Sequence, residues 1–165
     1  MQIKNKPWLY AILIVPSVAI FVPVYQNYFG NYYYNRSPSI PKGMYRSVVK
    51  DISVGDIIAF TPNDVFINFL AENDIKTYKF IFKNVAAVAG DHVCYSDNSV
   101  QINRKYTINY SADIVRKYQI TVPEFCGEIP TGSVFVVSDD LQNGYDSRYF
   151  GLLSESHIKD VIEAF

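Results

Sequence analysis

The chain has 165 residues, which is enough for one domain of ordinary size and too few for two. Its 15 Lys and Arg residues nearly balance 16 Asp and Glu residues, and the formal net charge of −1 excludes a nucleic-acid binder that works through bulk positive charge. With 49% hydrophobic and 19% charged residues, the composition also excludes a disordered chain.

A long uncharged segment near the N-terminus predicts a membrane anchor. Residues 7–25 contain no charged side chain, and as a helix they would span about 28 Å, close to the thickness of the hydrocarbon core. Lys4 and Lys6 stand just before the segment, so the positive-inside rule orients the N-terminus toward the cytoplasm. The sequence therefore predicts a cytoplasmic N-terminus (1–6), a single transmembrane signal anchor (7–25) and a periplasmic β-rich domain (26–165).

Two other interpretations of residues 7–25 compete with the anchor. A cleaved signal peptide would end at the small residues Ser17-Val18-Ala19. A buried core helix of this length would be expected to carry a polar face, which the segment lacks. The apolar run continues past Ala19 and so favours the anchor, but the sequence leaves open whether the segment is cleaved.

The rest of the chain alternates short apolar runs with turn signals, which predicts a mainly β fold: a folded sheet or barrel-like domain. A single helix is expected after Thr61-Pro62-Asn63-Asp64, where a capping side chain and a proline precede apolar residues on one face. Residues 104–125 and 139–147 show no such pattern and are predicted to be flexible. The predicted strands are 44–49, 55–61, 78–89, 92–95, 99–103, 133–138 and 157–164, with a hairpin turn at 96–98.

The two cysteines, Cys94 and Cys126, leave two possibilities open. They have no second pair of ligands at a suitable spacing, so neither a metal site nor a metal cofactor is expected. In an oxidising compartment the two thiols could form a disulfide. Two buried free thiols are the equally weighted alternative.

One candidate for catalytic chemistry is the segment around Ser39. Pro38 and Pro41 restrict the backbone on either side, which would present the Ser39 hydroxyl on a rigid, extended segment just outside the membrane. Taken alone, the same pattern describes an ordinary turn that leads into a strand.

A second candidate is Lys83, in the predicted strand 78–89. Strand alternation places Ile81, Lys83 and Val85 on one face, and a lysine that is buried there would have a lowered pKa. A neutral lysine amine is able to act as general base for a serine hydroxyl. Lys79 lies on the same face of the predicted strand, and composition does not choose between the two lysines.

A third cluster lies near the C-terminus, where Ser138-Asp139-Asp140 is followed by Asp146-Ser147-Arg148-Tyr149-Phe150-Gly151. The Asp146 carboxylate and the Arg148 guanidinium could pair and hold a loop. The alternative is a solvated polar turn.

Together these clusters resemble the signal peptidase I superfamily, and most closely its conjugative-transfer (TraF-type) branch. Ser39-Ile40-Pro41 looks like the Ser-x-Pro motif of the superfamily, and Gly43-Met44-Tyr45-Arg46 is similar to the G-x-Y-R run of the conjugative branch. Lys83 stands eight residues before Asp91 of Gly90-Asp91, the spacing of the family's catalytic lysine, whereas Lys79 does not fit. The Asp-Ser-Arg box is matched by 146–148.

The resemblance implies a serine endopeptidase with a Ser/Lys dyad. Ser39 would be the nucleophile and Lys83 the general base. The Ser39 backbone N–H and the Ser37 hydroxyl would form the oxyanion hole, and no cofactor or metal is implied. Structural support would come from the last box: Asp146, Ser147 and Arg148.

The chain departs from the family pattern near this last box. Many members carry a serine two residues before the aspartate, where it helps to orient the lysine, and here that position is Gly144. The Gly-Asp-Asn that is usual before it reads Ser138-Asp139-Asp140.

The implied function is cleavage of leader peptides from exported precursors at the outer face of the inner membrane, with pilin maturation for conjugative transfer as the leading case. The expected partners are a precursor protein and inner-membrane lipid, without nucleic acid. A housekeeping signal peptidase and a non-catalytic, membrane-anchored assembly module are the alternatives. The sequence does not reveal the substrate, the oligomeric state or whether the product is cyclised.

Overall fold

The computed structural model describes residues 30–76 and 78–165, and this part of the chain is mainly β, as predicted. Four short helical segments interrupt the strands: α2 (Asp64–Glu72), α3 (Ala112–Tyr118), α4 (Ser147–Phe150) and the 3₁₀ turn η1 (Glu155–His157). The strands are β1 (Tyr32–Asn35), β2 (Gly43–Val48), β3 (Ile57–Phe60), β4 (Ile81–Ala87), β5 (His92–Tyr95), β6 (Ser99–Ile102), β7 (Tyr106–Asn109), β8 (Cys126–Glu128), β9 (Ser133–Val137), β10 (Leu153–Ser154) and β11 (Ile158–Ala164).

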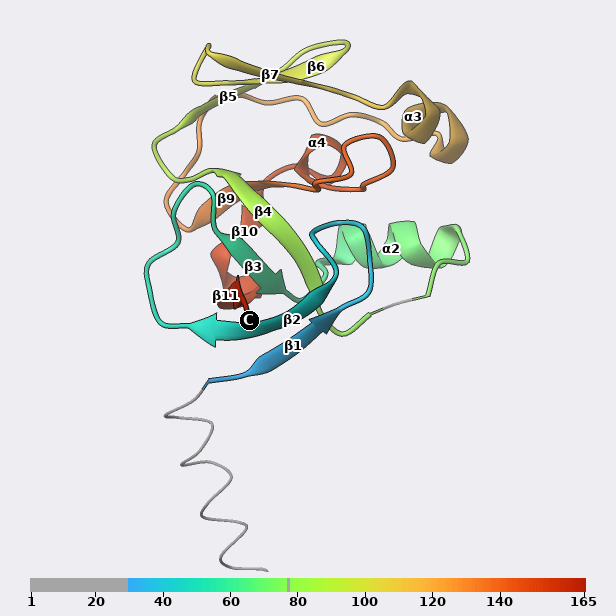
Figure 1. Ribbon diagram of the computed structural model, residues 1–165. Helices are drawn as coiled ribbons and strands as arrows, with labels where there is room; N and C mark the ends of the chain where they lie inside the picture. Colours follow the sequence, from blue (N-terminus) through green and yellow to red (C-terminus); the bar gives the residue numbers. More distant parts are fainter. Residues whose placement is uncertain (1–29, 77) are drawn as a thin grey trace, which may run out of the picture. The chain divides into compact units, whose positions relative to one another are not determined.

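The larger sheet has seven strands in the order β1-β2-β11-β3-β4-β9-β10 (Figure 1). The last strand of the chain, β11, pairs antiparallel with both β2 and β3 and so lies inside the sheet. β4 pairs antiparallel with β3 on one side, where Lys83 is opposite Ile58, and with β9 on the other. This order brings the strand that carries Lys83 next to the strand that ends before Ser138.

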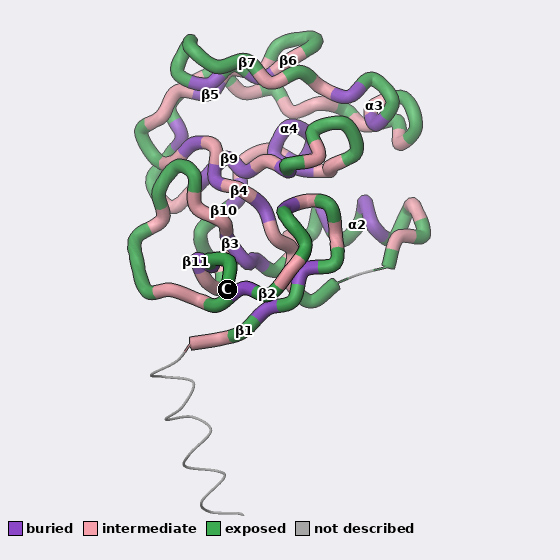
Figure 2. The backbone as a smooth tube through the Cα atoms, in the orientation of Figure 1, coloured by how far each residue is buried: buried purple, intermediate pink, exposed green. Residues whose placement is uncertain are grey.

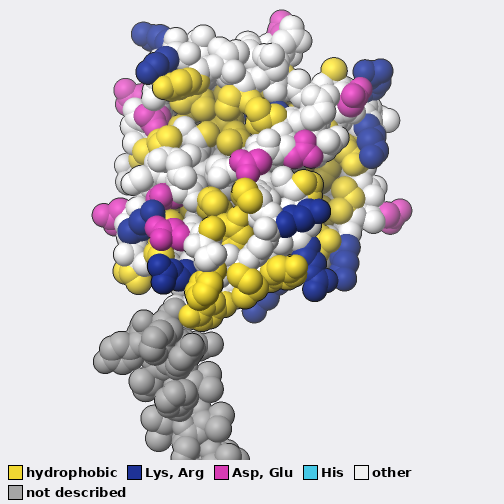
Figure 3. Space-filling model, in the orientation of Figure 1, with side chains coloured by type: hydrophobic (Ala, Val, Ile, Leu, Met, Phe, Trp, Pro, Cys, Tyr) yellow, Lys and Arg dark blue, Asp and Glu magenta, His cyan; other side chains and the backbone are white. Residues whose placement is uncertain are grey.

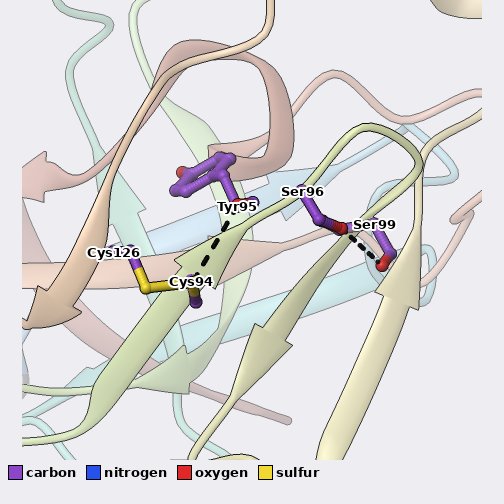
Figure 4. Close-up of a disulfide and its surroundings, with 5 residues drawn as sticks. All are labelled: Cys94, Tyr95, Ser96, Ser99 and Cys126. Carbon is purple, nitrogen blue, oxygen red and sulfur yellow. Dashed lines mark hydrogen bonds between the residues drawn. A yellow bond between two sulfur atoms is a disulfide. The ribbon is translucent and has the colours of Figure 1, made fainter.

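The smaller sheet has four strands in the order β7-β6-β5-β8. The predicted hairpin turn between β5 and β6 is present, and the Ser96 backbone N–H donates to the Ser99 carbonyl over 2.9 Å. Cys94 and Cys126 are directly opposite each other on β5 and β8, and their side chains form a disulfide (Figure 4). Of the two possibilities that the sequence leaves open, the structure therefore has the disulfide.

Apolar side chains form the core around the larger sheet, and Figure 2 shows buried residues concentrated along β3, β4 and β9 and in α4. Helix α2 begins as the sequence indicates: the Asn63 side chain caps it by accepting from the Phe66 N–H over 2.9 Å. The helix then buries one apolar face against this core: Phe66, Phe69 and Leu70.

Three expectations need correction or stay outside the described part. Residues 104–125 were predicted to be a flexible stretch, and the structure instead has β7 and α3 there. α3 is capped by the Ser111 hydroxyl, which accepts from Ile114 N–H over 3.4 Å, so a cap and one buried apolar residue suffice for this short helix.

The segments 1–6 and 7–25 lie outside the described residues. Within the described residues, no helix has the length and hydrophobicity needed to span a bilayer.

Candidate functional site

Ser39 lies in the loop between β1 and β2, and this loop is folded around one buried side chain. Asn35, at the end of β1, is 2% exposed. Its amide group donates to the carbonyls of Ser37 and Ile40 over 2.9 Å each, and to the Pro41 carbonyl over 3.1 Å. Its carbonyl oxygen accepts from both the N–H and the hydroxyl of Ser37 over 3.0 Å. Asn35 therefore fixes the loop that carries the candidate nucleophile.

The loop is also fixed from outside. The Tyr45 hydroxyl donates to the Pro41 carbonyl over 2.7 Å, and the Asp139 N–H donates to the Ser39 carbonyl over 2.8 Å. Ile40 turns its side chain into a core cluster and is 1% exposed. Ser39 itself is half-buried.

The two candidate oxyanion donors lie side by side in this loop. The Ser39 backbone N–H points to the Ser37 hydroxyl oxygen over 3.4 Å. The Ser37 hydroxyl in turn donates to the Asn35 side-chain oxygen over 3.0 Å, so in this conformation both groups form hydrogen bonds within the loop.

Lys83 reaches this loop from the middle of β4. Strand alternation places Lys83, Val85 and Ala87 on the buried face, as the sequence pattern predicts, and Lys83 is 2% exposed. Its Nζ atom lies 3.3 Å from Ser39 Oγ and also donates to Ser138 Oγ. Lys79, the alternative candidate for the lysine base, is exposed, and its amine lies over the Phe80 ring.

Burial changes the chemistry of this amine. Desolvation lowers the pKa of Lys83 to about 8, with the Arg148 charge acting in the same direction and the Asp146 and Asp140 carboxylates opposing it. A shift of this size amounts to about 3 kcal/mol of differential interaction between the two protonation states. About a tenth of the amine is therefore neutral at pH 7, far more than for an ordinary lysine, and this neutral form is able to accept a proton from the hydroxyl 3.3 Å away.

Behind the amine, Asp146 and Arg148 form a fully buried ion pair, both 0% exposed. The guanidinium binds the carboxylate through two bonds of 2.8 Å, and its remaining donors reach the carbonyls of Asn109, Leu141 and Gly144. Of the two interpretations of this cluster, the paired one is confirmed. The pair ties the loop 138–146 to the end of β7.

Ser147 makes structural hydrogen bonds and, unlike Ser39, is not a hydrogen-bond partner of Lys83. Its side chain is buried, its hydroxyl accepts from the Val136 N–H over 3.0 Å, and its carbonyl accepts from the Tyr95 hydroxyl over 2.6 Å. These bonds join α4 to both sheets. Ser147 thus lies in the framework of the site and away from the Ser39–Lys83 contact.

Sequence reasoning missed two residues. Asn35 had a signal, because an asparagine just before a turn commonly binds the backbone two residues later, as it does here with Ser37. Ser138 belongs to the third cluster and to the departure from the family pattern, and neither assigns it a role, although it directly follows the buried strand β9 and accepts from Lys83 Nζ. Within residues 30–76 and 78–165, no cluster of three or more His, Cys, Asp or Glu side chains is arranged to hold a metal ion.

Comparisons with known proteins identify the family of the chain. The family model described as "Signal peptidase, peptidase S26" matches residues 6–164. Signal peptidase I of Bacillus caldolyticus is 25% identical over 173 residues, covering 94% of this chain and 85% of the relative. A plasmid transfer protein TraF from Escherichia coli is 26% identical over 162 residues, covering 91% of this chain and 90% of the relative.

Two further matches are more limited. Signal peptidase I V of Bacillus subtilis is 24% identical over 95 residues, and the match covers 52% of this chain and 56% of that protein. A crystal structure of a signal peptidase I from Enterococcus faecalis V583 has a TM-score of 0.42 at 21% identity and covers 70% of this chain and 100% of that chain. Because the family model spans nearly the whole sequence, the chain belongs to the peptidase S26 family of signal peptidases, in which its similarity extends to the TraF plasmid transfer proteins.

Proposed function

We propose that this chain is a membrane-anchored serine endopeptidase that removes leader peptides from exported precursors, and that its main substrate is a pilin precursor of a conjugative transfer system. The single observation that carries the catalytic part is the 3.3 Å distance between the buried Lys83 amine and the Ser39 hydroxyl. The family and its TraF relatives support the substrate class.

In the first half of the reaction, Ser39 Oγ attacks the scissile carbonyl carbon and its proton passes to Lys83 Nζ. The oxyanion that forms is bound by the Ser39 N–H and by the Ser37 hydroxyl, which leaves its bond to Asn35 to donate there. The carbon–nitrogen bond then breaks, and Lys83 gives its proton to the leaving amine. The product is an ester between Ser39 and the carboxyl end of the leader peptide, and the mature protein leaves as the free amine.

In the second half, a water molecule attacks the ester carbonyl and gives a proton to Lys83. The oxygen–carbon bond to Ser39 breaks, and the proton returns to Ser39 Oγ. Lys83 is thus neutral at the start and at the end of the cycle, which the lowered pKa of about 8 favours.

The proposed location is the periplasmic face of the inner membrane, with residues 7–25 as the anchor and residues 26–165 outside. Two observations support it. A disulfide between Cys94 and Cys126 suits an oxidising compartment. Figure 3 shows apolar side chains on the visible surface between scattered charged groups. Large apolar residues are exposed on β1 and β2, and such residues suit the headgroup level of a bilayer: Tyr32, Tyr34 and Met44.

Processing of a purified precursor by the full chain in detergent micelles tests the proposal. Ser39→Ala and Lys83→Met are each expected to lower the rate by at least about 10⁴-fold, because they remove the nucleophile and the base. Matched controls are Ser53→Ala and Lys79→Met, which make the same changes at exposed positions and are expected to leave processing intact.

The outcomes separate the candidate functions. Unchanged processing by both site variants would contradict the dyad. Assembly of the transfer apparatus in cells that carry only Ser39→Ala would favour the non-catalytic assembly module. Equal rates on a pilin precursor and on unrelated exported precursors would favour a housekeeping signal peptidase.

A further inference from the structure

A lysine that acts as a base must be oriented as well as neutral. A neutral amine has one lone pair and two N–H groups, and the lone pair of Lys83 must face the Ser39 hydroxyl to take its proton. At least one N–H therefore needs an acceptor on another side of the nitrogen. Among the described residues, the hydrogen-bond partners of Lys83 Nζ are the hydroxyls of Ser39 and Ser138.

Ser138 is held as a fixed acceptor. It is 1% exposed and follows directly after β9, which pairs with the strand of Lys83. Its backbone N–H donates to Asp146 Oδ2 over 2.9 Å, and that carboxylate is itself held by Arg148 through two bonds. The buried ion pair thus fixes the backbone of Ser138, and with it the point from which the side chain carries the hydroxyl toward Lys83.

Gly144 provides the space for this hydroxyl. The loop turns back on itself between Asp140 and Gly144, where the Gly144 N–H donates to the Asp140 carbonyl over 2.8 Å. A Cβ atom at position 144 would overlap both side-chain atoms of Ser138 and lie 2.6 Å from the Asp140 carbonyl oxygen. Any side chain at 144 would therefore compete with the Ser138 hydroxyl for the same volume.

We propose that Ser138 is the positioning residue of Lys83, and that position 144 must be glycine because its empty side-chain volume is where the Ser138 hydroxyl lies. The proposal rests on the proposed function in taking Lys83 as the base. Ser138 acts through Lys83 and not on the substrate.

The proposal has a consequence for the titration of Lys83. An acceptor stabilises the ammonium more than the amine, so its loss should lower the pKa of Lys83 further below about 8. The other charged groups that act on Lys83, namely Asp146, Arg148 and Asp140, remain in place when only the hydroxyl of Ser138 is removed.

Two measurements on the full chain in detergent micelles test the proposal. The first is precursor processing, where we expect Ser138→Ala to lower kcat by about 10²-fold with KM unchanged, because a misplaced reacting group costs a factor of this order. The second is the ¹³C NMR shift of the Lys83 Cε atom against pH, assigned by loss of the signal in Lys83→Met. Its midpoint should move to lower pH in Ser138→Ala and return in Ser138→Thr, which keeps the hydroxyl.

A second variant disturbs the same contact from the opposite side. Gly144→Ala retains Ser138 but places a Cβ atom in the volume of its hydroxyl and against the Asp140 carbonyl, so the loop must shift, and the variant is expected to reproduce both the loss of kcat and the shift of the midpoint. Ser53→Ala, on the surface, is the matched control and should change neither.

The results separate this proposal from the proposed function. If the wild-type chain processes no precursor, the proposed function fails, and the titration alone still decides whether Ser138 positions Lys83. A Lys83 midpoint that is the same in the wild type, Ser138→Ala and Gly144→Ala would overturn the proposal, as would a kcat within about twofold of the wild type in both variants.

Discussion

The protein buries two cations within one site, and the regions around them are built in opposite ways. Arg148 is 0% exposed and faces a carboxylate and three backbone carbonyls, which together use all five of its N–H donors. Lys83 is 2% exposed and faces two serine hydroxyls. Burial is nearly equal, so the difference lies in the partners.

The partners decide which cation keeps its proton. Burial works to lower the pKa of Arg148, but the hydrogen bonds and charge of Asp146 outweigh it and the pKa is raised. At Lys83 burial is the largest influence, the carboxylate of Asp146 opposes it only in part, and the pKa falls to about 8. The same carboxylate therefore keeps the structural cation charged, while the neighbouring amine loses its proton near pH 8.

The largest expected effect on stability is at the structural cation. Arg148→Met leaves the Asp146 carboxylate buried without its partner, and removing one member of a buried pair costs about 3–5 kcal/mol. We expect the free energy of unfolding, measured by urea denaturation in detergent micelles, to fall by this amount.

The matched control for this variant removes both charges. Asp146→Asn with Arg148→Met leaves no buried charge at the pair, so it should recover a large part of the loss. If Arg148→Met is as stable as the wild type, the ion pair is not what holds the loop 138–146. Arg148 would then not be a structural cation, and the contrast with Lys83 would fail.

A smaller effect of opposite sign is expected at Lys83. Because its pKa is lowered in the folded state, the buried ammonium destabilises the protein at every pH below about 8. As the pH rises from about 8 toward about 10.4, the folded state releases its proton before the unfolded state does, and the penalty disappears. Lys83→Met should therefore be more stable than the wild type at pH 7 by about 1–3 kcal/mol, after allowing for its lost hydrogen bonds.

Urea denaturation at pH 7 and at pH 10 measures this difference. The gap between Lys83→Met and the wild type should close at the higher pH. Lys79→Met serves as the control, because an exposed lysine pays no desolvation penalty and its removal should change stability little at either pH. A gap that stays constant with pH would mean that the amine is not desolvated.

Much of this contrast could be predicted from the sequence, since it depends on local patterns. Alternation along 78–89 places Lys83 on the buried face, and the Asp146–Arg148 pair spans only two residues. The strands rich in apolar and β-branched residues were also predicted to within a few residues, as for β9. Each of these features is fixed by neighbours in the chain.

What the sequence could not supply depends on the meeting of distant segments. The contact of Lys83 with Ser138 joins residues 55 positions apart, and it exists only because β4 and β9 pair. The disulfide was left open for the same reason, since it depends on β5 and β8 being opposite each other. The strand β8 is short and lacks an alternating pattern, so only its pairing partner defines it.

The smallest expected effect concerns the pH dependence of processing. If neutral Lys83 is the base, kcat/KM should rise with pH along a single acid limb with its midpoint near 8, the pKa that burial gives this amine. The neutral fraction is about a tenth at pH 7 and about nine tenths at pH 9, so the rate constant should increase by roughly tenfold between them. Lys83→Arg places a second guanidinium in the site, and because this group does not lose its proton in proteins, the variant should be inactive across this whole range. A kcat/KM that stays constant between pH 7 and 9, or activity in Lys83→Arg, would mean that Lys83 does not accept the proton of Ser39. The two buried cations would then differ in their surroundings but not in catalytic role.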